Sequence, residues 1–167
     1  HAIAVKIRDN QKPRNLVMVH GFNDTKDTFV FLEEFLSQTF NLISLDLRGH
    51  GDSDWKSDGL YNYSEAILDL HTVAETFAGN KYSLLGHSLG GGLSARYAGM
   101  YPENIEILIC LEGFSGLQAM ERERLRIREW LGSMYKKKEK NNLDSIRRTL
   151  NKEEAIQKLG FIYQGLD

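Results

Sequence analysis

The amino-acid sequence predicts an α/β protein with a mostly parallel sheet that carries helices on both faces. Short apolar runs rich in β-formers alternate along the chain with segments of helical periodicity. The runs in the middle of the chain are continuous and apolar, as is usual for parallel strands buried on both sides. Strands that alternate with helices are joined by right-handed crossovers, which make the strands parallel.

Five segments are expected to be strands. A turn over residues 9–13 follows the first strand, and His20-Gly21 ends the second abruptly. The expected strands span residues 3–7, 16–19, 41–46, 82–85 and 105–111.

Two helices are expected between the second and the fourth strand. The first has Asp24 as its N-cap, with Asp27 three residues later. The second has Ser64 as its N-cap and stops at Gly79-Asn80. Apolar residues recur at helical spacing in the first helix, at Phe29, Phe31, Leu32, Phe35 and Leu36. In the second helix one apolar stripe is expected, formed by Ile67, Leu70, Ala74 and Phe77.

The segment around Ser88 combines the end of a strand, a tight turn and the start of a third helix. Gly86 and Gly90 stand two residues either side of Ser88, where a chain that folds back from strand into helix leaves room only for hydrogen. The turn is expected to hold Ser88 in a strained conformation with its hydroxyl exposed, beside the unpaired first N–H of the helix. A hydroxyl nucleophile next to a free donor is half of an acyl-transfer site. The helix is expected to run to about Met100 and to break at Tyr101-Pro102.

Several polar residues come directly after the expected strands: His20, Asp46, Ser88 and Glu112. In open sheets of this kind, the functional site lies at the carboxyl ends of the strands. The four positions therefore converge on one edge of the predicted sheet, and this convergence indicates a site more strongly than any single motif.

The balance of charge changes along the chain. Residues 1–110 carry 9 Lys/Arg and 14 Asp/Glu, a net of −5, whereas residues 111–167 carry 12 and 9, a net of +3. We therefore expect a core region over residues 1–115 and a second, helical region over residues 116–167.

Composition excludes several classes of partner. A net charge of −2 provides no field that would attract nucleic acid or an anionic membrane, and no apolar stretch approaches the roughly 20 residues that span a bilayer. Cys110 is the single cysteine, so no disulfide or thiolate cluster is expected, and no metal or cofactor spacing occurs. We expect a cytoplasmic protein with a small-molecule partner. The strand-like start at His1 suggests that the natural N-terminus lies upstream.

Three motifs in this order and spacing resemble the α/β-hydrolase superfamily: His20-Gly21-Phe22, the segment from Asp46 to Ser53, and Gly86-His87-Ser88-Leu89-Gly90. They look most like the branch of small esterases, C–C hydrolases and serine hydrolase-like proteins with a helical cap. The resemblance implies that residues 1–115 are the N-terminal part of the hydrolase core and that residues 116–167 begin the cap.

Carried over by position, the resemblance implies a role for three residues. Ser88 matches the nucleophile, and the backbone N–H groups of Phe22 and Leu89 match the donors of the oxyanion hole. Losing one such donor typically costs about 10²–10³ in rate. The serine at this position argues against the dehalogenase and epoxide hydrolase branches, which use Asp there.

The histidines and Asp46 have simpler interpretations. By the same resemblance, His20 and His87 occupy positions where the family uses histidine structurally, so neither is the favoured general base. His50 is expected to stabilise its glycine-rich turn, and His71 to be a surface residue. Asp46 is expected to fix the turn around Arg48.

Glu112 is a candidate for the acid of a catalytic triad, because it ends the strand next to that of Ser88. A structural or substrate-contact role is the alternative. The family places its catalytic histidine after the acid, and no histidine follows His87. We therefore expect this segment to be inactive alone, either as a fragment with an exposed strand edge or as a relic that binds without turnover.

The sequence thus favours a serine hydrolase that acts on a small ester or related acyl substrate through an acyl-serine intermediate. C–C bond hydrolysis or acyl transfer in the same pocket is one alternative, and a non-catalytic ligand-binding relic is another. Neither the acyl specificity nor the oligomeric state follows from the sequence.

Overall fold

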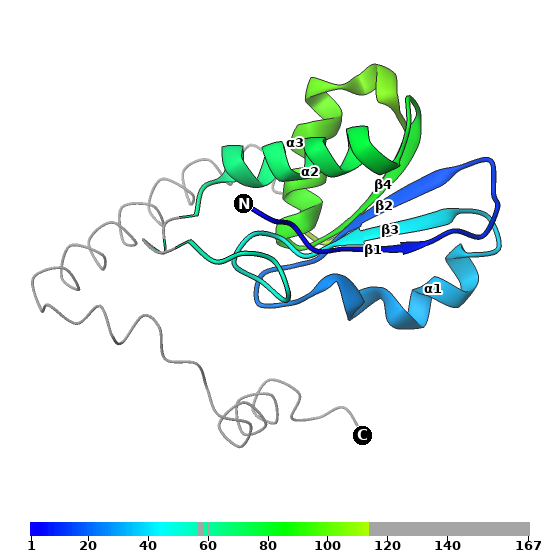
Figure 1. Cartoon of the computed structure of the whole chain (residues 1–167). Helices are drawn as coiled ribbons and strands as arrows, with labels where there is room; N and C mark the ends of the chain where they lie inside the picture. Colours follow the sequence, from blue (N-terminus) through cyan, green and yellow to red (C-terminus); the bar gives the residue numbers. More distant parts are fainter. Residues whose placement is uncertain (57–58, 60, 114–167) are drawn as a thin grey trace, which may run out of the picture. The chain divides into compact units, whose positions relative to one another are not determined.

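A computed structural model describes residues 1–56, 59 and 61–113, and in these ranges the chain forms a five-stranded sheet (Figure 1). The strand order is β1-β3-β2-β4-β5. Strands β2 to β5 are parallel, and β1 pairs with β3 antiparallel at one edge. The strands are β1 (Val5–Arg8), β2 (Asn15–Val19), β3 (Asn41–Leu45), β4 (Tyr82–His87) and β5 (Ile105–Leu111). The predicted fold class is confirmed. The cap segment expected over residues 116–167 lies outside the described residues.

The central strand β2 is buried on both faces. Leu16, Val17, Met18 and Val19 are all fully inaccessible to solvent. Because successive side chains point to opposite faces, Val17 and Val19 join one core cluster and Leu16 and Met18 join the other. This burial on both faces explains why the strand appears in the sequence as a continuous apolar run.

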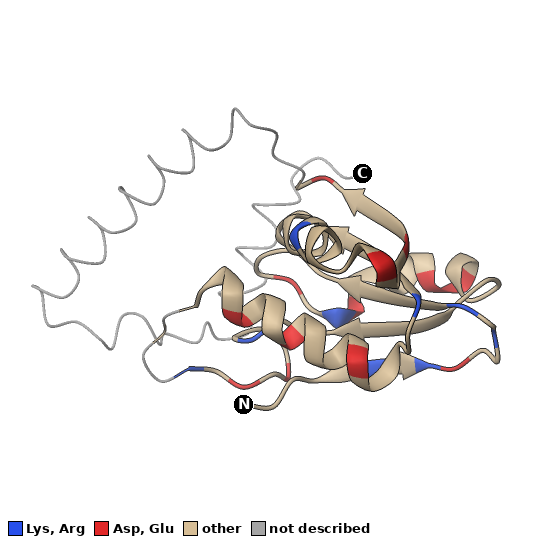
Figure 2. Ribbon diagram, turned by 90° about the horizontal axis from the view of Figure 1, so that it is seen from above, with Lys and Arg blue, Asp and Glu red and all other residues tan. Residues whose placement is uncertain are grey.

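Helices cover both faces of the sheet (Figure 1). Helices α2 (Tyr63–Phe77) and α3 (Leu89–Met100) pack over one face, and α1 (Val30–Leu36) packs over the other. Two short 3₁₀ helices, η1 (Lys26–Phe29) and η2 (Pro102–Asn104), precede α1 and β5. Acidic and basic residues are interspersed over these described elements rather than gathered on separate faces (Figure 2).

Both predicted N-caps were wrong by one or two residues. Thr25, not Asp24, caps η1, because its hydroxyl accepts a hydrogen bond from the N–H of Asp27. Asn62, not Ser64, caps α2, and its side-chain oxygen accepts from the N–H of Glu65 at 2.9 Å. Asn, Asp, Ser and Thr are all good N-caps, so where several of them lie close together the sequence does not determine which one begins the helix.

Only two of the five apolar residues predicted for the first helix, Phe29 and Leu36, lie on its buried side. Phe31 and Phe35 are 87% and 71% exposed, whereas Phe29 and Glu33 are buried and Leu36 is half-buried. Positions 29, 33 and 36 have the i, i+4, i+7 spacing of a single helix face. Glu33 can lie on that face because its carboxylate binds the Lys6 ammonium of β1 at 2.8 Å. In α2, Leu70 and Ala74 are buried as predicted, but Phe77 in the last turn is 43% exposed.

Asp46 holds the loop that follows β3, as expected. Its buried carboxylate accepts hydrogen bonds from the Lys26 N–H at 2.6 Å, the Lys26 ammonium at 2.7 Å and the Asp52 N–H at 2.9 Å. Burial raises the pKa of Asp46, but the hydrogen bonds from Lys26 and Asp52 outweigh burial and hold the pKa below its ordinary 3.8. One buried carboxylate thereby joins the start of η1 to the turn after β3.

The turn from β4 into α3 has no room for side chains at its two flanking glycines. A Cβ at Gly90 would overlap the backbone carbonyl oxygen of Val19, and a Cβ at Gly86 would overlap that of Gly90. Helix α3 can therefore begin directly against the end of β2. Near its other end, Gly99 has nothing within 4 Å of the corresponding position.

These two positions give a matched test of the turn. Gly90→Ala should lower the free energy of unfolding by about 3 kcal/mol or more, because neither backbone can yield easily. Gly99→Ala, in the same helix, should raise it by about 0.5–1 kcal/mol through helix propensity. Urea unfolding followed by circular dichroism measures both. Equal effects at the two sites would show that α3 does not press against β2.

A second pair tests the Asp46 hub. Asp46→Asn should cost about 2–3 kcal/mol at pH 7, because it removes the buried partner of Lys26. Asp52→Asn should cost less than about 1 kcal/mol, because that carboxylate binds the same ammonium at the surface.

The pH dependence of the Asp46 pair follows from the depressed pKa. A carboxylate with a lowered pKa stabilises the fold above its ordinary pKa, and this contribution disappears as the pH falls through the folded-state value. Unfolding free energies at pH 7 and below pH 4 should therefore differ less in Asp46→Asn than in the parent protein. An identical acid dependence in both proteins would contradict the role of Asp46.

Candidate functional site

Ser88 stands at the turn between β4 and α3 in a backbone conformation that few non-glycine residues adopt. Its φ is 49° and its ψ is −112°. Its N–H donates to the carbonyl of Leu111 at 2.9 Å, and its own carbonyl accepts from the N–H of Gly92 at 3.1 Å. Strain of this kind costs about 1–3 kcal/mol and concentrates at functional sites. Among the described residues, none forms a hydrogen bond with the half-exposed Ser88 hydroxyl.

The loop after β2 lies directly beside Ser88. A Cβ at Gly21 would stand 3.3 Å from the Ser88 Cβ and 3.0 Å from Nδ1 of His87. The loop that carries Phe22 and the helical turn that starts with Leu89 therefore meet at Ser88. Within the described ranges the N–H of Phe22 has no hydrogen-bond partner, and that of Leu89 is one of the first N–H groups of α3, which have none inside the helix.

His20 uses both ring nitrogens to hold this loop. Nε2 accepts from the N–H of Leu47 at 2.9 Å, so Nδ1 carries the proton and donates to the carbonyl of Gly21 at 2.6 Å. Burial lowers the pKa of His20, although its hydrogen bond to Gly21 partly offsets the shift. His20 is a neutral, fully engaged structural residue, in line with the sequence-based interpretation.

Two other histidines also lie near the site. Nδ1 of His50 is 3.1 Å from the carbonyl oxygen of Arg48, which can only accept, so His50 stabilises its turn as predicted. The His50 ring meets the Phe22 ring edge-on at 5.8 Å. His87, the last residue of β4, is half-buried against Gly21.

The prediction that His71 is a surface residue was wrong. The ring is half-buried, stacks on Tyr101 at 4.8 Å, and places Nδ1 3.0 Å from the hydroxyl of Tyr97. That hydroxyl also lies 2.8 Å from the hydroxyl of Tyr82. Burial raises the pKa of both buried tyrosines, so they remain protonated. The apolar spacing of α2 does not indicate this hydrogen-bonded series of His71, Tyr97 and Tyr82, because the three residues come from three different elements.

Glu112 follows β5, and the backbone around it lies beside Ser88 and the first turn of α3. Leu111, the residue before it, accepts the Ser88 N–H, and the carbonyl of Glu112 faces Gly91 in the first turn of α3. Glu112 has a φ of 61°, and Gly113 has a φ of 78° and touches the Ser88 carbonyl. The Glu112 residue is exposed, and no described histidine contacts its carboxylate by a hydrogen bond.

A cavity of about 210 Å³ opens beside the Phe22 loop and the start of α3. Aromatic and aliphatic side chains form most of its wall. The wall includes Phe22, His50, Tyr61, Tyr63, Leu89 and the buried Arg48. Sequence reasoning missed this cavity, although the aromatic residues just before α2 were a visible signal.

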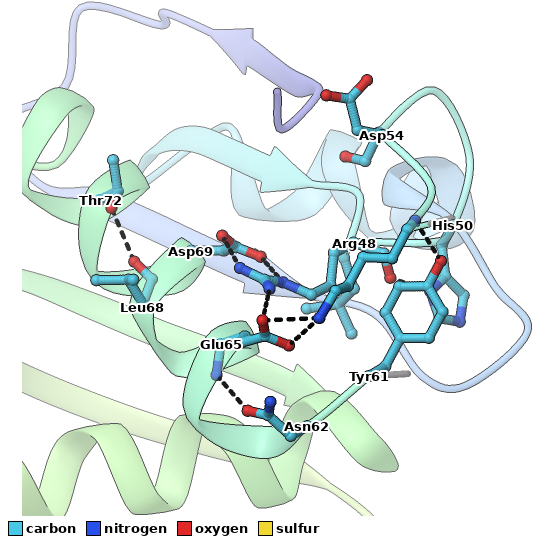
Figure 3. A network of polar contacts seen from close by, with 12 residues as sticks. Arg48, His50, Asp54, Tyr61, Asn62, Glu65, Leu68, Asp69 and Thr72 are labelled. Atoms are coloured by element: carbon cyan, nitrogen blue, oxygen red, sulfur yellow. Dashed lines mark hydrogen bonds and ion pairs between the residues drawn. The ribbon is translucent and has the colours of Figure 1, made fainter. Parts of the chain in front are cut away.

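A network of charged side chains holds Arg48, which lines the cavity, in place (Figure 3). Arg48 donates from Nε and Nη2 to the Asp69 carboxylate at 2.6 and 2.7 Å, and its Nη1 lies 3.1 Å from Glu65. Lys56 donates to both oxygens of Glu65, and its backbone N–H donates to the hydroxyl of Tyr61. The pairing with Asp69 raises the pKa of Arg48, and the bond from Lys56 lowers the pKa of Glu65.

The arrangement can support attack by a hydroxyl on a carbonyl carbon, with two backbone donors beside the carbonyl oxygen. Within the described ranges, no group of three or more His, Cys, Asp or Glu side chains is placed to hold a metal ion. The helices described there also include none that is both long and apolar enough to cross a bilayer.

Comparison with known proteins identifies close similarity in sequence and in structure. The family model for the alpha/beta hydrolase fold matches residues 14–153. A serine hydrolase-like protein of Mus musculus is 35% identical over 111 residues, which are 66% of this chain and 36% of the mouse protein.

Solved structures show the same fold. An esterase from Exiguobacterium antarcticum aligns with a TM-score of 0.58 at 28% identity, over 65% of this chain and 40% of the esterase. An alpha/beta hydrolase from Sphaerobacter thermophilus aligns with a TM-score of 0.56 at 30% identity, with the same coverage. The chain spans less than half the length of these relatives. With a family match over most of its length, the chain belongs to the alpha/beta hydrolase fold family.

Proposed function

We propose that the protein is a serine hydrolase that cleaves a small ester or related acyl substrate through an acyl intermediate on Ser88. The observation that carries the proposal is the strained, positive-φ conformation of Ser88 where β4 turns into α3, beside the Phe22 loop. The names of the relatives, a serine hydrolase-like protein and an esterase, support the same chemistry.

In the proposed reaction, the Ser88 oxygen attacks the carbonyl carbon of the ester as a base removes the hydroxyl proton. The negative charge on the carbonyl oxygen is stabilised by the N–H groups of Phe22 and Leu89. The bond to the alcohol breaks, the alcohol takes up the proton, and water then hydrolyses the acyl-serine. Both hydrolysis products, an acid and an alcohol, account for all atoms of the ester and the water.

Three of the five histidines of the chain are engaged elsewhere and are not proposed as the general base. Both ring nitrogens of His20 are already hydrogen-bonded. The hydrogen bonds given for His50 and His71 go to Arg48 and Tyr97 and not to Ser88. Glu112 remains the proposed acid of the triad, on the ground of its place at the end of β5, with a structural role as the alternative.

A non-catalytic, ligand-binding role is the second candidate. It is favoured by one observation: no described residue forms a hydrogen bond with the Ser88 hydroxyl. C–C bond hydrolysis or acyl transfer would use the same site and differ only in the bond cleaved or the acceptor.

Ser88 should be the residue that reacts with a fluorophosphonate probe in the full-length protein. Ser88→Ala should abolish labelling, since the probe forms its covalent bond with an activated serine. The control is Ser64→Ala, which removes an exposed hydroxyl in the first turn of α2 and should leave labelling intact. Labelling that persists in Ser88→Ala would contradict the assignment.

A polypeptide of residues 1–167 should hydrolyse p-nitrophenyl acetate only slowly. With no histidine assigned as the base, the expected catalysis is that of binding and oxyanion stabilisation alone, worth roughly 10³–10⁴ over water and well below an intact triad. Stopped-flow or steady-state absorbance measures the rate. A rate typical of esterases that disappears in both Ser88→Ala and His87→Gln would place the base at His87.

A further inference from the structure

We propose that the cavity beside Ser88 binds the acyl group of the substrate and selects a small, apolar, uncharged one. This inference rests on the proposed function, because it takes Ser88 as the nucleophile. Phe22 and Leu89, the residues whose N–H groups are the proposed oxyanion donors, both line the cavity. An acyl carbonyl held by those donors would therefore extend its chain into this space.

The size of the cavity limits the acyl group. A volume of about 210 Å³ is below the roughly 300–1,000 Å³ of sites for drug-sized ligands. Ala66 of α2 and Leu93 of α3 complete the apolar lining. The space suits a short branched or a single-ring acyl group.

The charge of the wall decides against an anionic acyl group. Arg48 is the one lysine or arginine among the described residues that line the cavity, and it is only 9% exposed. Each of its three guanidinium nitrogens already faces a carboxylate oxygen of Asp69 or Glu65. Lys56 is neutralised by the same Glu65, so the two cations and two carboxylates of the network balance.

Two acceptor oxygens of the wall are engaged within the fold. The Tyr61 oxygen accepts the N–H of Lys56, and the Asn62 side-chain oxygen accepts the N–H of Glu65. A substrate carboxylate in this cavity would lose its water without gaining a free cation. Partial loss of hydration with no free cation in return is unfavourable, so the wall discriminates against a carboxylate.

Two esters of equal shape test this selectivity in the full-length protein. The p-nitrophenyl ester of 4-methylpentanoic acid carries an isopropyl group where the mono-p-nitrophenyl ester of succinic acid carries a carboxylate. The kcat/KM for the neutral ester should exceed that for the anionic ester by at least about tenfold. Equal values, or a preference for the anionic ester, would overturn the proposal.

Glu65→Gln tests the cause of the selectivity. It leaves Arg48 paired with Asp69 and removes the carboxylate that Lys56 contacts, so the ratio of neutral to anionic kcat/KM should fall by about fivefold. The matched control is Glu34→Gln on the exposed surface of α1, which should leave the ratio unchanged. An equal response of the two variants would overturn the role of the network.

Ala66→Leu tests the location of the acyl group. The added side chain should reduce kcat/KM for the 4-methylpentanoate ester relative to the acetate ester by about tenfold, because the cavity loses volume. Thr72→Leu, on the exposed part of the same helix, is the control and should not change this ratio. An unchanged ratio in Ala66→Leu would show that the acyl group binds elsewhere.

A binding experiment separates failure of this inference from failure of the proposed function. Ser88→Ala protein is titrated with the N-methylamide of 4-methylpentanoic acid, which is neutral, and with the mono-N-methylamide of succinic acid, which is anionic. Neither is an ester, and binding is followed by ligand-observed NMR. Preferential binding of the neutral amide, lost in Ser88→Ala/Ala66→Leu, supports the cavity even if no ester is hydrolysed. Preferential binding of the anionic amide, or no binding of either, overturns it.

Discussion

The close approach of helix α3 to strand β2 is the constraint on which the site depends. Gly90 allows the first turn of the helix to rest against the carbonyls of Val19 and His20, and Gly86 allows the strand to reach that turn. The same contact puts Ser88 in its strained conformation and brings the loop of Phe22 beside it. The positions of Ser88, the proposed nucleophile, and of its proposed backbone donors are thus consequences of one backbone contact.

Buried acids form a second pattern in the described part of the chain. Glu33, Asp46 and Asp69 are each buried, and each is bound by a cation from a distant segment, namely Lys6, Lys26 and Arg48. A buried carboxylate without its cation would be strongly destabilising, so each pair is satisfied only in the native arrangement. The three pairs join β1 to α1, the β3 loop to η1, and the β3 loop to α2.

Local patterns in the sequence were enough to predict the strands, the order of the helices and the turn at Ser88. The turn was predictable because its glycines and serine lie within five residues and obey a steric rule. The N-caps were not, because Asn62 and Ser64 are equally suitable by type. The buried face of α1 was missed because Glu33 depends on Lys6, and the cavity wall was missed because Arg48 meets Asp69 only through the fold.

The central place of β2 in the strand order has a consequence for how the site comes into being. Val17 of β2 pairs with Leu84 of β4, 67 positions later, after β3 has already supplied a nearer partner for the other edge of β2. Closing so long a loop is slow relative to local pairing. The turn from β4 into α3, which carries Ser88, acquires its shape only when this pairing is complete. A chain that has formed its helices and its first three strands therefore still lacks the arrangement around Ser88, which arises only when β4 joins the sheet.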